Sequence, residues 1–198
     1  MFSRLIRRIH MYLGLFLAPW MLLYAASTIA MNHRAWFERY YGGRLVVWEK
    51  EAERRWGGDV PSGLSGRAVA ARILADLGMQ GAHTVNGPDA SGGITVVRSA
   101  ALTPRRVHYS PSEGKLVIEK QVFRAPVFLE RMHRRRGYEQ PHVRDDLWAF
   151  SVDMVIAAMV FWALSGLWMW WEMRATRAWG LVCAAVGVSL FALFLATI

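Results

Sequence analysis

Three long apolar runs constrain this chain more than any other feature of its sequence. Residues 11–31 contain no charged side chain, residues 147–171 contain one, Asp153, and residues 178–198 contain none. An α-helix rises about 1.5 Å per residue, so about 20 such residues cross a hydrocarbon core about 30 Å thick. The chain is therefore predicted to be a membrane protein with three transmembrane α-helices in contact with the lipid bilayer.

The segment between the first two runs is the part of the chain that can fold in water. We predict that residues 34–144 form one extramembrane α+β domain. It is inserted between a tail and first helix in residues 1–33 and a second helix in residues 145–172. Residues 173–198 then supply a short polar turn and the third helix.

Local patterns inside this domain predict one helix and several strands. Apolar residues recur at helical spacing from residue 65 to residue 77, and Gly78 follows, as at many helix ends. Three runs rich in β-branched residues, separated by Gly, Pro and Ser, predict an antiparallel meander. These runs are residues 94–98, 106–109 and 115–122, with a further strand predicted at residues 44–48.

The basic charge of the chain is almost entirely guanidinium. The formal net charge is +9 with 24 Lys plus Arg, of which only Lys50, Lys115 and Lys120 are lysines. Guanidinium groups favour pairing with carboxylates and phosphates. A basic domain beside a bilayer is attracted to anionic headgroups, and no nucleic-acid motif occurs, so nucleic acid is not an expected partner. The single cysteine, Cys183, excludes an intrachain disulfide and a thiolate metal cluster.

The arginines that flank the apolar runs bear on the orientation of the domain. Arg4, Arg7 and Arg8 precede the first run and Arg174 and Arg177 lie between the last two, which predicts that both segments are cytoplasmic. Five arginines shortly before the second run oppose this orientation by raw count. Long segments nevertheless cross membranes largely regardless of charge. We therefore predict a cytoplasmic N-terminus and a domain in the periplasm or an equivalent compartment.

Four histidines lie where the predicted helices meet water. His10 begins the first helix on its inner side, His33 ends it on the outer side, and His133 and His142 lead into the second helix. A b-type haem between helices needs one or two neutral imidazoles and apolar walls. His33 is therefore a candidate haem ligand together with His133 or His142, whereas His10 needs a methionine or a second protomer. The alternative for each is an ordinary hydrogen-bonded histidine at the interface.

Charged side chains near these histidines complete the set of candidates. Arg134, Arg135, Arg136 and Arg144 are cations that could bind haem propionates. Asp153 lies about two turns inside the second helix, where a carboxylate is costly and usually has a partner. It is a candidate either for proton transfer or for a buried hydrogen bond to the first helix.

Five short motifs follow one another along the chain. They are RIHMYLG at residues 8–14, AMNH at 30–33, LERMH at 129–133, VD at 152–153 and LSGLWMW at 164–170. Together they resemble the PepSY-associated transmembrane family. The resemblance implies a bacterial inner-membrane protein with a PepSY-like periplasmic domain and a link to iron acquisition.

Larger members of that family look like ferric-siderophore reductases that carry b-type haem on histidines. The resemblance would give this role to His10, His33 and His133 here. The chain departs from the pattern in two respects, because Ser27-Thr28 replaces a Thr-Gly pair and three apolar runs replace four or more. These departures favour a single haem or a homo-oligomer.

Two functions therefore remain open. The first is a haem b electron-transfer protein, a ferric reductase or a subunit of one, that serves a ferric siderophore or another periplasmic redox partner. The second is a non-enzymatic, membrane-anchored PepSY module that binds a protease, a peptide or a transporter. Copper handling by Met and His is a third reading, but no Met-x-x-Met motif or His-rich tract supports it.

Overall fold

The computed structural model describes residues 2–57, 65–135, 137–138 and 142–197. The chain divides into two compact units, Met1–Met21 with Val152–Ile198 and Leu22–Ser151. Both divisions fall inside long helices, and each unit has its own internal packing.

Three long helices carry the apolar runs of the sequence. They are α1 (Phe2–Asn32), α5 (Val143–Glu172) and α6 (Arg177–Thr197), the last preceded by the 3-10 turn η1 (Arg174–Thr176). Each is long and apolar enough to cross a membrane, which confirms the prediction of three such helices. The described side chains of α6 are not buried by protein, as suits an apolar helix surrounded by lipid.

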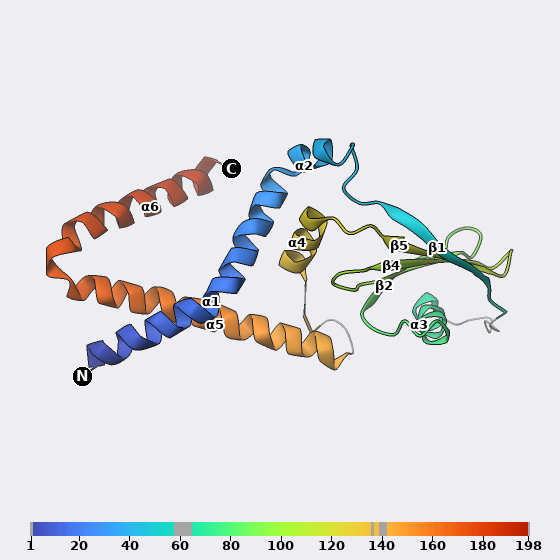
Figure 1. Ribbon diagram of the computed structural model, residues 1–198, viewed down its shortest axis with the longest axis horizontal. Helices are drawn as coiled ribbons and strands as arrows, with labels where there is room; N and C mark the ends of the chain where they lie inside the picture. The colour runs from blue at the N-terminus through green and yellow to red at the C-terminus, as the bar shows by residue number, and fades with distance from the viewer. Residues whose placement is uncertain (1, 58–64, 136, 139–141, 198) are drawn as a thin grey trace. The chain divides into compact units, whose positions relative to one another are not determined.

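A five-stranded antiparallel sheet forms the centre of the second unit (Figure 1). Its strands are β1 (Trp48–Arg55), β2 (His83–Asn86), β3 (Ile94–Arg98), β4 (Arg105–Ser110) and β5 (Lys115–Gln121). Strands β2 to β5 are a meander, and β1 pairs with β5, so the spatial order is β1-β5-β4-β3-β2. The two edge strands are therefore β1 and β2.

Helix α3 (Gly66–Asp76) packs on one face of this sheet and builds the core of the unit (Figure 1). Its apolar stripe, which includes Ile73 and Leu74, contacts alternate strand residues such as Val96, Val107 and Leu116. Successive strand side chains point to opposite faces, so this alternation buries one face under α3. The other face carries polar side chains and is left for other contacts.

A serine caps the N-terminus of α3. Ser65 has extended backbone angles, and its hydroxyl oxygen accepts a hydrogen bond from the Ala68 backbone N–H at 3.3 Å. We expect Ser65→Ala to lower the free energy of unfolding of this unit by about 1 kcal/mol, because one helix N–H loses its partner. Chemical unfolding of the full-length protein in detergent measures the change. Ser65→Asn keeps a capping oxygen and should unfold like the wild type, so equal losses in both variants would contradict the cap.

The structure confirms much of the secondary structure predicted for the domain and corrects one strand. Helix α3 and strands β3, β4 and β5 fall on the predicted runs. The strand predicted at residues 44–48 is wrong, because those residues lead up to β1, which begins at Trp48. Six of the eight residues of β1 are charged, so no apolar pattern indicates it, and pairing with β5 forms it instead. Helices α2 (Arg34–Tyr40) and α4 (Ala125–Arg134) and strand β2 were not predicted.

Candidate functional site

His133 lies on α4 and is held by two residues of α1. Its Nδ1 atom is 2.7 Å from the Ser27 hydroxyl oxygen, and its ring meets the Tyr24 ring edge-on with centroids 5.0 Å apart. The Ser27 hydroxyl donates its proton to the Tyr24 carbonyl at 2.7 Å. A hydroxyl has one proton to donate, so the Ser27 oxygen accepts from the Nδ1–H of His133. In that tautomer the lone pair of the ring lies on Nε2, the nitrogen that Ser27 does not contact.

His10 has the same arrangement in the other unit. Its Nδ1 atom is 2.9 Å from the Ser165 hydroxyl oxygen, and that hydroxyl donates to the Trp162 carbonyl at 2.9 Å. The His10 ring stacks on the Trp162 ring with centroids 5.1 Å apart and planes inclined by 12°. By the same reasoning Nδ1 of His10 carries the proton and Nε2 carries the lone pair.

The two histidines therefore share one local design. In each case a serine on a long apolar helix binds the ring nitrogen, and the aromatic residue three positions before that serine packs against the ring. Ser27 is 0% exposed and Ser165 is 5% exposed, so water does not compete for either hydroxyl. A partner that fixes one imidazole N–H orients the ring and leaves the other nitrogen as a ligand, which is the usual support of metal-binding histidines.

The other two candidate histidines are placed differently. His33 is exposed and caps α2 through its backbone, without a side-chain hydrogen bond to that helix. His142 immediately precedes α5, and its carbonyl accepts from the backbone N–H groups of Asp145 and Asp146. Across the described residues, neither a hydrogen bond nor a ring contact joins His33 to His133 or to His142.

Asp153 lies on α5 with an exposed side chain, in the compact unit that also contains His10. Its two predicted roles, proton transfer and a hydrogen bond to the first helix, stay predictions. Groups of three or more His, Cys, Asp or Glu side chains able to hold a metal ion were not found in the described part of the chain.

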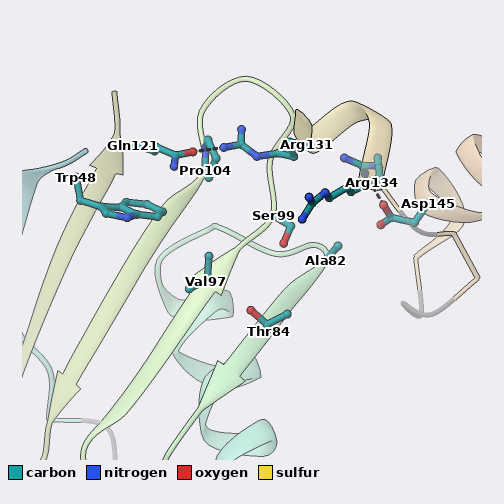
Figure 2. A pocket seen from close by; sticks show the side chains of 11 residues that line it. Trp48, Ala82, Thr84, Val97, Ser99, Pro104, Gln121, Arg131, Arg134 and Asp145 are labelled. Carbon is teal, nitrogen blue, oxygen red and sulfur yellow. Dashed lines mark hydrogen bonds and ion pairs between the residues drawn. The ribbon is translucent and has the colours of Figure 1, made fainter. Parts of the chain in front are cut away.

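The three described candidate arginines, Arg134, Arg135 and Arg144, line cavities beside the sheet. Arg135 donates to the Asp145 carboxylate at 2.5 Å, and Arg134 is 3.4 Å from the carboxylate of Glu130. Arg134 and Arg135 line a cavity of about 420 Å³ on the sheet face opposite α3 (Figure 2). Arg144 lines a neighbouring cavity of about 380 Å³. Arg136 lies outside the described residues.

A polar network covers the middle of the same sheet face. The Glu119 carboxylate accepts from Arg106 at 2.6 Å and lies 3.0 Å from Nε2 of His108, whose Nδ1 is 3.0 Å from the Thr95 hydroxyl. The hydrogen bond from Arg106 lowers the pKa of the Glu119 carboxyl below its ordinary value, against the opposing effect of burial. The network ties β3, β4 and β5 together on the face that α3 does not cover.

This network makes the stability of the domain depend on pH. The pKa of Glu119 is lower in the folded than in the unfolded state, so its contribution is complete above the unfolded pKa of about 4.5. That contribution is lost as the pH falls through the folded value. We expect Arg106→Gln to lower the thermal unfolding temperature at neutral pH, with the difference from wild type shrinking as the pH falls below about 4.

A matched variant separates the pH-dependent loss of stability from a loss that is the same at every pH. Arg98 donates to the backbone carbonyls of Met79 and Gln80, which do not titrate. The difference between Arg98→Gln and wild type should therefore stay constant over the same pH range. A constant difference for Arg106→Gln as well would contradict the assigned role of Glu119.

Sequence reasoning named His10 and His133 as candidates but did not anticipate the residues that contact them. The two sites share a local pattern, because α1 and α5 each contain an aromatic residue followed three positions later by serine, Tyr24 with Ser27 and Trp162 with Ser165. The pattern alone does not identify them, since Trp148 and Ser151 have the same spacing. No known family model, curated protein or solved structure matches the chain. The likeness of its motifs to one family therefore stays a resemblance, and function has to be argued from the site.

Proposed function

We propose that this protein is an inner-membrane electron-transfer protein that binds b-type haem through His133 and His10. Its electrons would pass to a periplasmic acceptor such as a ferric siderophore. The observation that carries the proposal is the repeated serine–histidine pair, in which a buried hydroxyl holds Nδ1–H and leaves Nε2 to bind iron. Iron ligation by histidine needs an oriented imidazole with a lone pair on one ring nitrogen.

The donor set fits haem better than it fits a free metal ion. Structural and catalytic metal sites usually gather three or four protein ligands, whereas haem takes one or two axial ligands and brings the rest of its coordination itself. Each serine–histidine pair offers one such ligand on an apolar helix or beside one. A bound haem would supply one-electron chemistry, and the residues of this chain would hold the imidazole and exclude water.

The candidates for a second imidazole differ between the two units. His33 and His142 belong to the same unit as His133 and are its candidate partners. The unit of His10 contains no other histidine in its sequence, so a second imidazole there would have to come from another copy of the chain or from another protein. This asymmetry supports either one haem per chain or a homo-oligomer.

The alternative function, an anchored PepSY module that captures a peptide strand, has weaker support. Strand addition needs an open, regular sheet edge. Strand β1 is charged at six of its eight positions and β2 has four residues, and both features discourage edge pairing. The sheet therefore offers poor edges for a peptide.

A reduced-minus-oxidised absorption spectrum of the detergent-purified full-length protein tests the proposal. We expect the sharp bands of a low-spin b-type haem, with a pyridine haemochrome assay giving the number of haems per chain. A colourless protein after expression with added haem would reject the proposal and leave the anchored module as the better reading.

The direction of electron transfer depends on the side of the membrane that the domain occupies. A reporter inserted at Gly114, in the turn between β4 and β5, tests this without interrupting a strand. We expect a periplasmic reporter to be active and a cytoplasmic one to be silent. The reverse result would remove the periplasmic acceptor from the proposal while leaving haem binding untouched.

A further inference from the structure

A cavity on the uncovered sheet face has the size of a small-molecule site. It has a volume of about 420 Å³ and lies between the sheet and the C-terminal part of α4 (Figure 2). Small-molecule pockets usually have volumes of about 300 to 1,000 Å³. All of its lining residues belong to the unit Leu22–Ser151, so the site is contained in one compact part of the chain.

The cavity lining carries more positive than negative charge. Three guanidinium groups, Arg131, Arg134 and Arg135, line it together with a single carboxylate, Asp145. Asp145 pairs with Arg135, and the Glu130 carboxylate pairs with Arg134 outside the cavity lining. Arg131 is the exception among the three, because both of its described acceptors are neutral.

Arg131 is fixed in place by neutral acceptors, with no counterion among the described residues. It donates to the side-chain oxygen of Gln121 and, at 2.9 Å, to the Ala101 carbonyl. Gln121 is buried, so this bond holds the guanidinium in one orientation, as Figure 2 shows. Burial lowers the pKa of Arg131, which means that its surroundings disfavour the charge. A ligand oxyanion would offset that cost, and the remaining N–H groups of the guanidinium are available to bind it.

The rest of the lining is neutral and largely apolar. Trp48, Val97 and Pro104 offer apolar surface, and Thr84 and Ser99 offer hydroxyl groups. Trp48 lies on the opposite side of the cavity from the arginines of α4 (Figure 2). The cavity is therefore suited to a molecule that is anionic at one end and apolar at the other.

We propose that this cavity binds a small organic carboxylate or phosphate, with its oxyanion on Arg131 and Arg134 and its apolar body against Trp48, Val97 and Pro104. This function goes beyond haem binding, although Arg134 and Arg135 are also the predicted propionate-binding arginines. It does not require haem, because neither His10 nor His133 lines the cavity. Guanidinium groups are preferred for such oxyanions because their planar fork matches carboxylate and phosphate geometry.

Calorimetric titration of the full-length protein in a neutral detergent tests the proposal with phenyl phosphate as the probe. We expect saturable binding, weaker by about 10-fold or more for inorganic phosphate, which lacks the apolar body. The neutral analogue benzyl alcohol should not bind measurably. The absence of saturable binding by phenyl phosphate, or equal affinity for benzyl alcohol, would overturn the proposal.

Two arginine variants and one control identify the cavity as the site. Arg131→Gln should weaken phenyl phosphate binding by about 10-fold to 100-fold, through the loss of a charged hydrogen-bond donor. Because Arg131 also holds Gln121, the exposed Arg134→Gln provides a second variant that leaves those contacts intact, with a smaller loss expected. Arg67→Gln, on the exposed surface of α3, should bind like wild type. Unchanged affinity in both cavity variants would overturn the assignment.

The same phosphate chemistry could come from a lipid headgroup or from a free ligand. Titration in nanodiscs distinguishes the two sources, because anionic lipid would compete with phenyl phosphate and zwitterionic lipid alone would compete less. If phenyl phosphate binds with equal affinity in both lipids, the cavity takes a free ligand. If phenyl phosphate binds more weakly in anionic lipid, the cavity takes a lipid headgroup. With either result, the cavity still binds an oxyanion, as proposed.

Discussion

Replacing His133 with alanine is expected to remove the haem that α4 helps to bind. The reduced-minus-oxidised bands should disappear if His133 holds the only haem and fall to about half if His10 holds a second one. The physical reason is that alanine has no lone pair to offer to iron, and Ser27 has no other described imidazole to orient. Absorption spectra at matched protein concentration, normalised by a pyridine haemochrome assay, measure the loss.

Two further substitutions determine whether the serine acts as a positioning residue. Ser27→Ala leaves the ligand in place but removes the acceptor of its Nδ1–H, which should weaken haem binding by about 10-fold to 100-fold. Thr28→Ala is a matched control on the same turn, because the Thr28 hydroxyl is exposed and donates only to the Tyr24 carbonyl. Wild-type spectra and haem affinity in both His133→Ala and Ser27→Ala would rule out this site.

Truncating a buried core side chain, which leaves a void beneath α3, is expected to have the largest effect on the stability of the domain. Leu116 is 0% exposed and packs between β5 and α3, so Leu116→Ala should lower the free energy of unfolding by about 2 to 5 kcal/mol. That loss is large for a domain whose total stability is about 5 to 15 kcal/mol. Hydrogen–deuterium exchange of the full-length protein in detergent should accelerate throughout β3, β4 and β5.

The control for this experiment is a leucine of the same domain that packs poorly. Leu102 is 60% exposed, and Leu102→Ala should change stability by less than about 0.5 kcal/mol. Exchange in α6 should be unaffected in both variants, because α6 belongs to the other compact unit. Equal acceleration in the two variants would show that exchange does not report on the core.

The buried polar side chains connect the fold with the two proposed sites. Four such side chains occur in the described chain, Ser27, Ser165, Gln121 and Asp145. The two serines bind the ring nitrogens of His133 and His10, and the other two bind arginines of the anion cavity. Burying a polar group costs free energy unless it is hydrogen-bonded. Each of these four therefore has a defined partner, and in each case the partner is a candidate ligand-binding residue.

The sequence by itself determined the features that depend on local pattern. Three uncharged or nearly uncharged runs of about 20 residues specify apolar helices whatever the rest of the chain does, because a bilayer core excludes charge and unpaired backbone groups. Helix α3 and strands β3 to β5 followed from helical spacing, β-branched runs and turn residues. His10 and His133 became candidates from the sequence as well, His10 at the start of the first run and His133 in the segment that leads into the second.

Only the tertiary structure decided which side chains meet. Strand β1 has no apolar pattern and exists because β5 offers it a hydrogen-bonding edge. The partners of the two histidines are 106 and 155 residues away from them along the chain, and Arg131 meets Gln121 across a turn and a change of element. Local propensity carries no information about such distant pairs. They form because folding buries their polar atoms together, where each must find a hydrogen-bond partner.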